Sequence, residues 1–204
     1  MTAERILKIK RIFEEYYPIV KTCVLRENKI CSRDITELMK LDYIVKVKTG
    51  YYAWRNDVKE LSRIELVQSI IPEGVISLVS AATIHKLIDG NTLENAAVYV
   101  TIPTNMIKPT LPVSPEIKLF YCSEEKLHIG RISLEMKNRT ITIYNKERTV
   151  CDLFKYLDRV NNDIALESLK KYMEQKDKNV QRLLEYAYLL RVKKYVEPLV
   201  EVLI

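Results

Sequence analysis

Residues 19–54, IVKTCVLRENKICSRDITELMKLDYIVKVKTGYYAW, carry two short helical patterns followed by two strand patterns. Pro18 suits the first turn of a helix and disfavours a helical Tyr17, so we expect the first helix to begin at Pro18. Its apolar stripe would consist of Val20, Cys23 and Val24. Asn28-Lys29 is a turn signal, which predicts the end of this helix.

A second helix is predicted over residues 32–40, with the Ser32 hydroxyl as its N-terminal cap. Its inward face would consist of Ile35, Leu38 and Met39. The opposite face carries Ser32, Arg33, Thr36, Glu37 and Lys40. Glu37 on that face either accepts a hydrogen bond from a base or faces solvent.

After residue 43 the apolar period changes from that of a helix to that of a strand. Residues 44–47 are mostly β-branched, and Lys48-Thr49-Gly50 forms a turn in which Gly50 supplies a positive φ. The second strand brings back Tyr51, Tyr52 and Trp54, of which Tyr52 and Trp54 are expected in the core. The order of helix, turn, helix and basic ribbon is that of a winged helix-turn-helix domain.

Such a domain places its second helix in a major groove while its ribbon touches backbone phosphates. The residues expected to contact DNA are Ser32, Arg33, Thr36, Lys40, Lys46, Lys48, Thr49 and Tyr51. Arg33 is the candidate for a base edge, because a guanidinium can bond guanine through two parallel hydrogen bonds. The alternative is a small α+β domain whose exposed helix and basic hairpin bind nothing.

The positive charge of the chain is unevenly spread. The 204 residues carry 33 Lys/Arg and 27 Asp/Glu, and residues 1–57 hold 12 of the basic and 8 of the acidic residues. This asymmetry favours a phosphate-binding N-terminal part and a nearly neutral remainder. No apolar run is long enough to cross a bilayer, and residues 1–10 lack a signal-peptide core. We therefore expect a cytoplasmic protein that does not associate with membranes.

The four cysteines are scattered along the chain. Cys23, Cys122 and Cys151 lie within apolar patterns and are expected to be buried free thiols. Together with Cys31 they form no C-x-x-C pair, and no pair of histidines lies nearby. We therefore expect no metal site and no cofactor.

Two domains are predicted, over residues 1–57 and 58–204, and the absence of a Gly/Ser linker indicates a packed junction. The first begins with a charged amphipathic helix at 2–16. The second is expected to be mixed α/β and to end in a helical bundle, which makes the whole chain α+β. Its expected helices are 58–70, 74–87 (stopped by Asp89-Gly90-Asn91), 147–157, 163–174, 178–191 and 194–203, and its expected strands are 97–103, 117–122, 129–136 and 140–144.

Five fragments, in this order, resemble the AbiEi family, the antitoxins of type IV toxin–antitoxin systems that act in abortive infection and phage defence. They are TGYYAW at 49–54, GVISLVSAATIHKL at 74–87, AVYVTIP at 97–103, YNKERTVCDLF at 144–154 and DIALESLKKYM at 163–173. The chain departs from the family at Leu41-Asp42, in a loop that often carries a glycine. Because Asp tolerates the left-handed conformation, we expect the turn to persist.

The resemblance implies an N-terminal winged helix-turn-helix that binds the protein's own promoter and represses its operon. It also implies a C-terminal antitoxin domain that counters a nucleotidyltransferase-type toxin encoded alongside, without a stable complex being required. We expect binding to inverted repeats, with a monomer in solution and two copies on the operator.

Glu147, Arg148 and Asp152 share one predicted helix. Arg148 and Asp152 are four residues apart and would form a salt bridge near a helix start. Alternatively, Arg148 belongs to a surface that antagonises the toxin or binds nucleic acid. The other basic residues assigned to that surface, which would otherwise be solvated, are Lys170, Lys171, Arg191, Lys193 and Lys194.

We do not expect an enzyme, and no catalytic residue is assigned. His85 is predicted at the core boundary and His128 in a loop, and neither belongs to a catalytic pattern. Two other classes remain open. A DNA-targeted, metal-dependent nuclease would hold Mg²⁺ on carboxylates such as Glu73, Asp89 and Asp152, whose spacing matches no metal motif. An effector-sensing repressor would bind a small ligand in the second domain.

Overall fold

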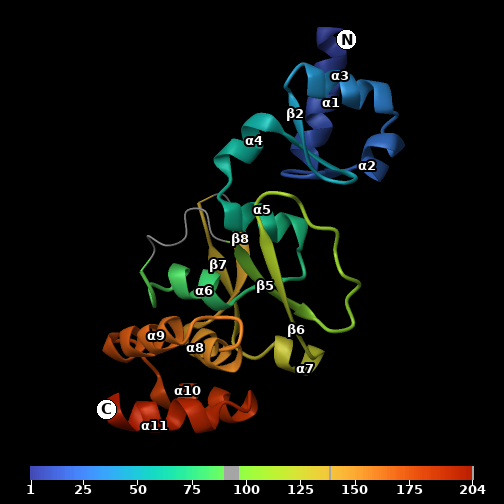
Figure 1. Ribbon diagram of the computed structural model, residues 1–204. Helices are drawn as coiled ribbons and strands as arrows, with labels where there is room; N and C mark the ends of the chain where they lie inside the picture. The colour runs from blue at the N-terminus through green and yellow to red at the C-terminus, as the bar shows by residue number, and fades with distance from the viewer. Residues whose placement is uncertain (90–96, 138, 204) are drawn as a thin grey trace. The chain divides into compact units, whose positions relative to one another are not determined.

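The computed structural model describes residues 1–89, 97–137 and 139–203. The chain is a mixed α+β protein, and these residues form 11 helices and two sheets (Figure 1). It divides into two compact units: the first comprises Met1–Pro72, Lys108–Pro115 and Lys137–Arg139, and the second the remaining segments. The domain boundary predicted between residues 57 and 58 falls inside the first unit, within helix α4 (Arg55–Glu60). None of the described helices combines the length and apolar character needed to cross a bilayer.

The first unit combines a small antiparallel sheet, ordered β1-β3-β2, with helices. Its elements are α1 (Ala3–Glu15), β1 (Val20–Lys21), α2 (Thr22–Glu27), α3 (Ser32–Lys40), β2 (Ile44–Lys48), β3 (Tyr51–Trp54), α4 and α5 (Arg63–Ile70). The amphipathic first helix is confirmed, with Ile9, Ile12 and Phe13 buried. The turn predicted at Asn28-Lys29 is confirmed, and the turn predicted at Lys48-Thr49-Gly50 is confirmed at Thr49-Gly50, with Lys48 still in β2 and Gly50 at φ +78°.

The helix predicted to begin at Pro18 begins later. Val20 lies in β1, where it pairs with Tyr52, and α2 starts at Thr22. A two-residue strand has no periodic signature, so its pairing with β3 leaves no mark in the local sequence. The change of element also corrects the prediction for Cys23, which is exposed, whereas Leu25 is the buried residue of α2.

Two other predicted helices are shorter than their patterns. The stretch 58–70 forms α4 and α5, because Ser62 and Glu65 cap each other's backbone amides and start a new helix there. The stretch 74–87 contributes strand β4 (Val75–Ile76) before α6 (Leu78–Ile84). Helix α6 therefore ends before the stop predicted at Asp89-Gly90-Asn91, of which residues 90 and 91 lie outside the described ranges.

The second unit is built on a mixed five-stranded sheet with the order β6-β5-β4-β8-β7. Besides β4, its strands are β5 (Val98–Pro103), β6 (Ile117–Cys122), β7 (Arg131–Glu135) and β8 (Thr140–Tyr144). Strands β5 and β6 run parallel, as do β4 and β8, while β4–β5 and β7–β8 are antiparallel. The four strands predicted from alternation are confirmed, and the central β4 is the one that sequence reasoning missed.

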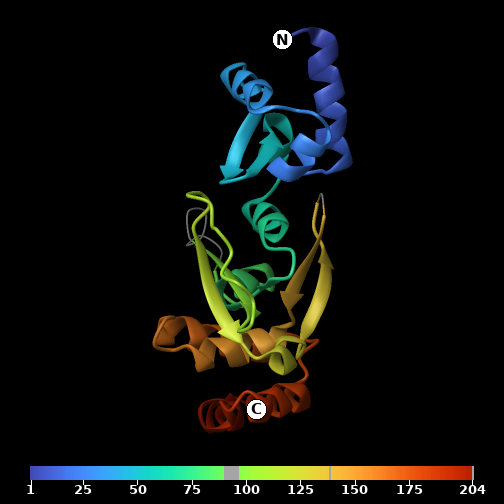
Figure 2. The ribbon, with the colours of Figure 1, turned by 90° about the vertical axis from the view of Figure 1, so that its right-hand side faces the viewer.

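Helices cover one face of this sheet and extend into a C-terminal bundle. They are α6, α7 (Glu124–Leu127), α8 (Lys146–Lys155), α9 (Asn162–Glu174), α10 (Val180–Leu189) and α11 (Lys193–Leu203). Helices α8 and α9 lie between the sheet and the α10–α11 pair (Figures 1 and 2). The four helices α8 to α11 share one apolar core, to which they contribute Leu153, Leu169, Leu183 and Val196 in that order. The predicted helical end of the chain is therefore confirmed.

Candidate nucleic-acid interface

The inner face of α3 packs into the core of the first unit. Ile35 and Leu38 are buried in the apolar cluster that also holds Phe13 and Trp54. The inward orientation predicted for Met39 is wrong, because its side chain is 40% exposed. Two buried residues one turn apart are sufficient to seat this short helix, and the next residue along the chain points away from the core.

The N-terminus of α3 is held by a carboxylate from inside the helix. Cys31, not Ser32, occupies the cap position, and the Cys31 amide donates to Asp34 Oδ2 at 3.2 Å. Arg5 of α1 donates to the same oxygen at 2.8 Å, and this hydrogen bond lowers the pKa of Asp34. Arg5 also donates to the Lys29 carbonyl at 2.9 Å. These bonds fix α3 to α1 and to the turn that precedes it.

The outer face of α3 carries the residues predicted to contact DNA. Ser32, Arg33, Thr36 and Lys40 are all exposed. The Thr36 hydroxyl donates to the Ser32 carbonyl at 2.9 Å, which leaves its oxygen able to accept a hydrogen bond. Glu37 forms an ion pair with the N-terminal ammonium group.

The hairpin of β2 and β3 presents Lys46 and Thr49 to solvent, as predicted. Lys48 is different, because the pairing register shifts between Lys46 and Lys48 and turns this side chain onto Tyr51. Lys48 is only 8% exposed, and its Nζ lies 4.1 Å from the centroid of the Tyr51 ring. Burial lowers the pKa of Lys48, and the nearby Lys21 lowers it further. The prediction of Lys48 as an open phosphate contact is corrected accordingly.

Lys21 is a candidate contact that sequence reasoning missed. It lies in β1 opposite Tyr51, and its Nζ is 5.9 Å from the Tyr51 ring centroid. Lys21 is exposed while its neighbour Val20 is fully buried, which is the alternation of a strand. That signal spans two residues and was hidden by the helix predicted over them. Lys21 and Lys48 thus place two cations around one aromatic ring.

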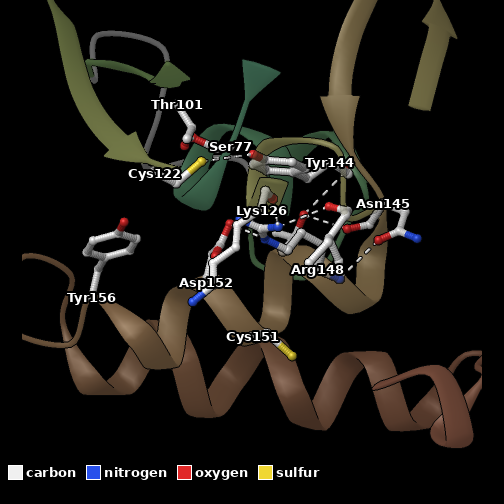
Figure 3. Close-up of polar contacts among 12 residues, drawn as sticks. Ser77, Thr101, Cys122, Lys126, Tyr144, Asn145, Arg148, Cys151, Asp152 and Tyr156 are labelled. Atoms are coloured by element: carbon white, nitrogen blue, oxygen red, sulfur yellow. Dashed lines mark hydrogen bonds and ion pairs between the residues drawn. The ribbon is translucent and has the colours of Figure 1, made fainter. Parts of the chain in front are cut away.

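In the second unit, Arg148 does not belong to a surface. Its side chain is 1% exposed, and its Nε donates to Asp152 Oδ2 at 2.9 Å (Figure 3). Its Nη1 donates to the carbonyls of Lys126 at 2.7 Å and Ile129 at 3.0 Å. The salt bridge predicted from the four-residue spacing is confirmed. The exposed role considered for Arg148 is wrong, because α8 is covered on several sides.

The surroundings of Arg148 form a closed polar cluster. Its guanidinium lies 4.2 Å from the centre of the Tyr144 ring, and the Tyr144 hydroxyl is 4.0 Å from Cys122 Sγ (Figure 3). Burial raises the pKa of the Asp152 carboxyl, and Arg148 opposes that increase. Gly130 packs so closely that a Cβ there would lie 2.6 Å from the Arg148 Cβ. We interpret the cluster as a structural joint between β8, α8 and the 123–130 segment.

The remaining basic residues assigned to the second unit are spread over two regions. Lys170 and Lys171 lie on α9, and Arg191, Lys193 and Lys194 lie where α10 gives way to α11. All are exposed except Lys171, which is half-buried and paired with Asp89 and with Glu167. Lys193 is paired with Glu197 at 3.1 Å. The structure therefore places these cations at the surface without gathering them into one patch with Arg148.

The groups considered for catalysis are not brought together. Among the described residues, no three His, Cys, Asp or Glu side chains lie close enough to hold a metal ion. Glu73 is exposed, whereas Asp152 is buried in an ion pair with Arg148. His85 hydrogen-bonds the Tyr144 carbonyl through Nε2 at 2.7 Å, and burial lowers the pKa of its imidazole. His128 is exposed at the end of α7.

Neither a scan against protein-family models nor a search of curated proteins finds a match to this chain.

Proposed function

We propose that the first unit is a winged helix-turn-helix that binds duplex DNA and that the protein is an autorepressor and antitoxin. One observation carries the DNA-binding part. A helix anchored on two sides, α3, exposes Ser32, Arg33, Thr36 and Lys40 and contacts β2, whose hairpin exposes Lys46 and Thr49. Cations and hydroxyls on a preformed helix beside a basic hairpin match what a major groove and its phosphates require.

The element order supports the winged-helix assignment. Two helices with the turn at Asn28-Lys29 between them precede a two-stranded hairpin, and β1 completes a three-stranded sheet. In this assignment α3 enters the major groove and Arg33 reads a base edge. Lys40, Lys46 and Lys21 bind the sugar–phosphate backbone, and Tyr51 supports them.

The antitoxin part of the proposal comes from the family resemblance. It assigns to the second unit the neutralisation of a nucleotidyltransferase-type toxin, by function and without a stable complex. We propose a cytoplasmic, non-enzymatic protein that binds inverted repeats in its own promoter as two copies. Exposed Lys170, Arg191, Lys193 and Lys194 are retained as candidate contacts for this role, and buried Arg148 is removed from it.

The decisive experiment for DNA binding is a mobility shift with the protein's own upstream DNA. Arg33→Ala should cost about 1–3 kcal/mol of specific binding free energy and relax the preference at one base position. Arg26→Ala, an exposed arginine in the last turn of α2, is the matched control and should bind like the wild type. Unchanged binding by Arg33→Ala would show that α3 is not the reading helix.

Neutralisation is tested separately, by expressing the chain from an unrelated promoter in cells that also express the adjacent nucleotidyltransferase gene. Growth should be restored by the wild type and equally by Arg33→Ala, because repression and neutralisation are assigned to different units. A chain that represses its promoter but never restores growth would leave the DNA-binding proposal standing and remove the antitoxin proposal.

A further inference from the structure

The second unit contains a pocket that the proposed function does not use. It has a volume of about 420 Å³ and lies between the α8–α9 loop, the start of α9, the first turn of α6, the segment after α6 and strand β5. Its apolar wall consists of Val79, Ile88, Val160 and Ile164. Its polar lining consists of Asp89, Tyr99, Arg159, Asn161 and Glu167. A pocket of this size with a few converging polar groups is typical of a small-molecule site.

Tyr99, which lines this pocket, is the outermost of three aromatic rings that pack on one another. Tyr99 stacks on Phe120 with their ring centroids 5.8 Å apart, and Phe120 meets Tyr156 edge-on at 4.9 Å. A cation lies near the face of each ring. The Lys118 Nζ is 5.4 Å from the centroid of the Tyr99 ring. The corresponding distances are 5.6 Å from the Arg159 guanidinium to Phe120 and 5.1 Å from the Lys155 Nζ to Tyr156. Aromatic rings interleaved with cations are the elements that hold the bases and phosphates of nucleotides.

The charged groups of the pocket restrict the class of ligand that it can bind. Asp89 and Glu167 both pair with Lys171, which offsets one of their two negative charges. Their carboxylates can still accept hydrogen bonds from hydroxyls, as acidic residues do with the ribose of bound nucleotides. The Arg159 side chain is 58% exposed, and within the described part of the chain it pairs with its exposed neighbour Asp158 at 3.6 Å, a weak ion pair that an incoming phosphate can replace.

We propose that this pocket binds a nucleotide. Its base lies against Tyr99 and the apolar wall, its ribose hydroxyls face Glu167 and Asp89, and its phosphate faces Arg159. Asn161 caps α9 by accepting from the Asp163 amide at 3.1 Å, and its side-chain NH₂ group is the part that can donate to the base. The site belongs to the second unit alone and does not depend on the proposed DNA-binding function. It would give the chain a nucleotide-sensing or RNA-binding activity of its own.

The test is a calorimetric titration of the full-length protein with AMP, GMP, CMP and UMP, with the matching nucleosides, and with a single-stranded 12-nucleotide RNA. At least one nucleotide should bind saturably, and its nucleoside about tenfold more weakly, because the nucleoside lacks the phosphate. Binding of the RNA but of no mononucleotide would assign the nucleotide to a strand. Failure of all four nucleotides and the RNA to bind would overturn the proposal.

Variants locate the binding in the pocket. Arg159→Gln, at an exposed position where folding is not at risk, should weaken binding about tenfold. Tyr99→Leu should weaken it to a similar extent while Tyr99→Phe, which keeps the ring, should retain it. Arg131→Gln on β7 and Tyr188→Leu on α10 are exposed controls that should bind normally. Nucleotide binding that survives Arg159→Gln and Tyr99→Leu but is lost on Lys46→Gln would place the ligand elsewhere and refute the inference.

Duplex DNA binding separates this inference from the proposed function. Arg159→Gln should bind the promoter like the wild type, and Arg33→Ala should bind the nucleotide like the wild type. Each activity can therefore fail without the other.

Discussion

Two ion pairs with the same four-residue spacing behave differently in this protein because of burial. Arg148 and Asp152 in α8 are 1% and 2% exposed, whereas Lys193 and Glu197 in α11 are 50% and 37% exposed. A buried pair excludes water, so each charge depends on the other for its solvation. The charges of an exposed pair are solvated by water whether or not they pair, so the pair contributes little to the free energy of unfolding.

Asp152→Ala should therefore lower the free energy of unfolding of the second unit by about 3–5 kcal/mol, because it leaves the Arg148 guanidinium buried without a counter-charge. Glu197→Ala should lower it by less than about 0.5 kcal/mol. The measurement is urea unfolding followed by far-ultraviolet circular dichroism. Equal costs for the two variants would mean that Arg148 finds water or another acceptor once Asp152 is gone.

His85 gives the second unit a predictable response to acid. Burial lowers the pKa of its imidazole, although the hydrogen bond to the Tyr144 carbonyl opposes this effect. Unfolded chains protonate histidine at about pH 6.5, so between that value and the lower folded pKa the unfolded state binds more protons. The stability contributed by neutral His85 is present above about pH 6.5 and is lost as the pH falls below it.

Replacing His85 by Gln, which retains a donor for the Tyr144 carbonyl, should flatten this dependence. Urea midpoints at several values between pH 7.5 and 5 would show it as a smaller loss of stability than in the wild type. His128→Gln, at an exposed position, should keep the wild-type dependence. A His85→Gln curve that runs parallel to the wild type would show that other groups control the acid response.

The N-terminus of α3 depends on the carboxylate of one residue, Asp34. Asp34 accepts from the Cys31 amide and from Arg5, so it caps α3 and ties it to α1 at once. Asp34→Ala should destabilise the first unit by about 1–2 kcal/mol. Fluorescence of Trp54, the single tryptophan of the chain, reports urea unfolding of this unit, because its ring packs on Phe13 of α1.

The matched control for Asp34→Ala is Glu27→Ala, at an exposed position in the last turn of α2. It should leave the unfolding midpoint unchanged. If Asp34→Ala retained both wild-type stability and promoter affinity, α3 would be held by its apolar face alone.

The elements that the sequence predicted well are those whose pattern repeats within one segment. Strands β6 (Ile117–Cys122) and β8 (Thr140–Tyr144) have the limits that alternation predicts, and α9 to α11 follow their apolar stripes to within two residues. The elements that were missed, β1 and β4, are two residues long and form only by pairing with distant strands. The pairing with those partners stabilises these strands, so no local sequence pattern can predict them.

At the scale of the whole molecule, the uneven charge predicts a strong response of DNA binding to salt. With about six phosphates neutralised, the promoter affinity should fall on the order of a thousandfold between low and moderate salt. Lys46→Gln and Lys21→Gln should each reduce the slope of log affinity against log salt by about one. Titrations of labelled promoter DNA at several salt concentrations measure that slope.

Lys194→Gln, on α11 of the second unit, is the control for these titrations and should leave the slope unchanged. A reduced slope for this variant would mean that the second unit also touches DNA, and the assignment of promoter binding to the first unit would need revision.

Features that depend on neighbours within about one turn or one hairpin could be predicted from local patterns: the helix stripes, the turns at Asn28-Lys29 and Thr49-Gly50, and the exposed face of α3. The sequence also placed the excess of positive charge in the first part of the chain. Which charged groups are buried depends on packing between segments that are distant in the sequence. Arg148 and Lys48 lie in sequence patterns that would also fit an exposed position. Arg148 is buried because the distant segment that contains Lys126 packs over it, and Lys48 is buried because a shift in strand register turns its side chain onto Tyr51. Burial is a property of the packed chain, and desolvation then determines whether a cation is a structural joint or a contact for a partner.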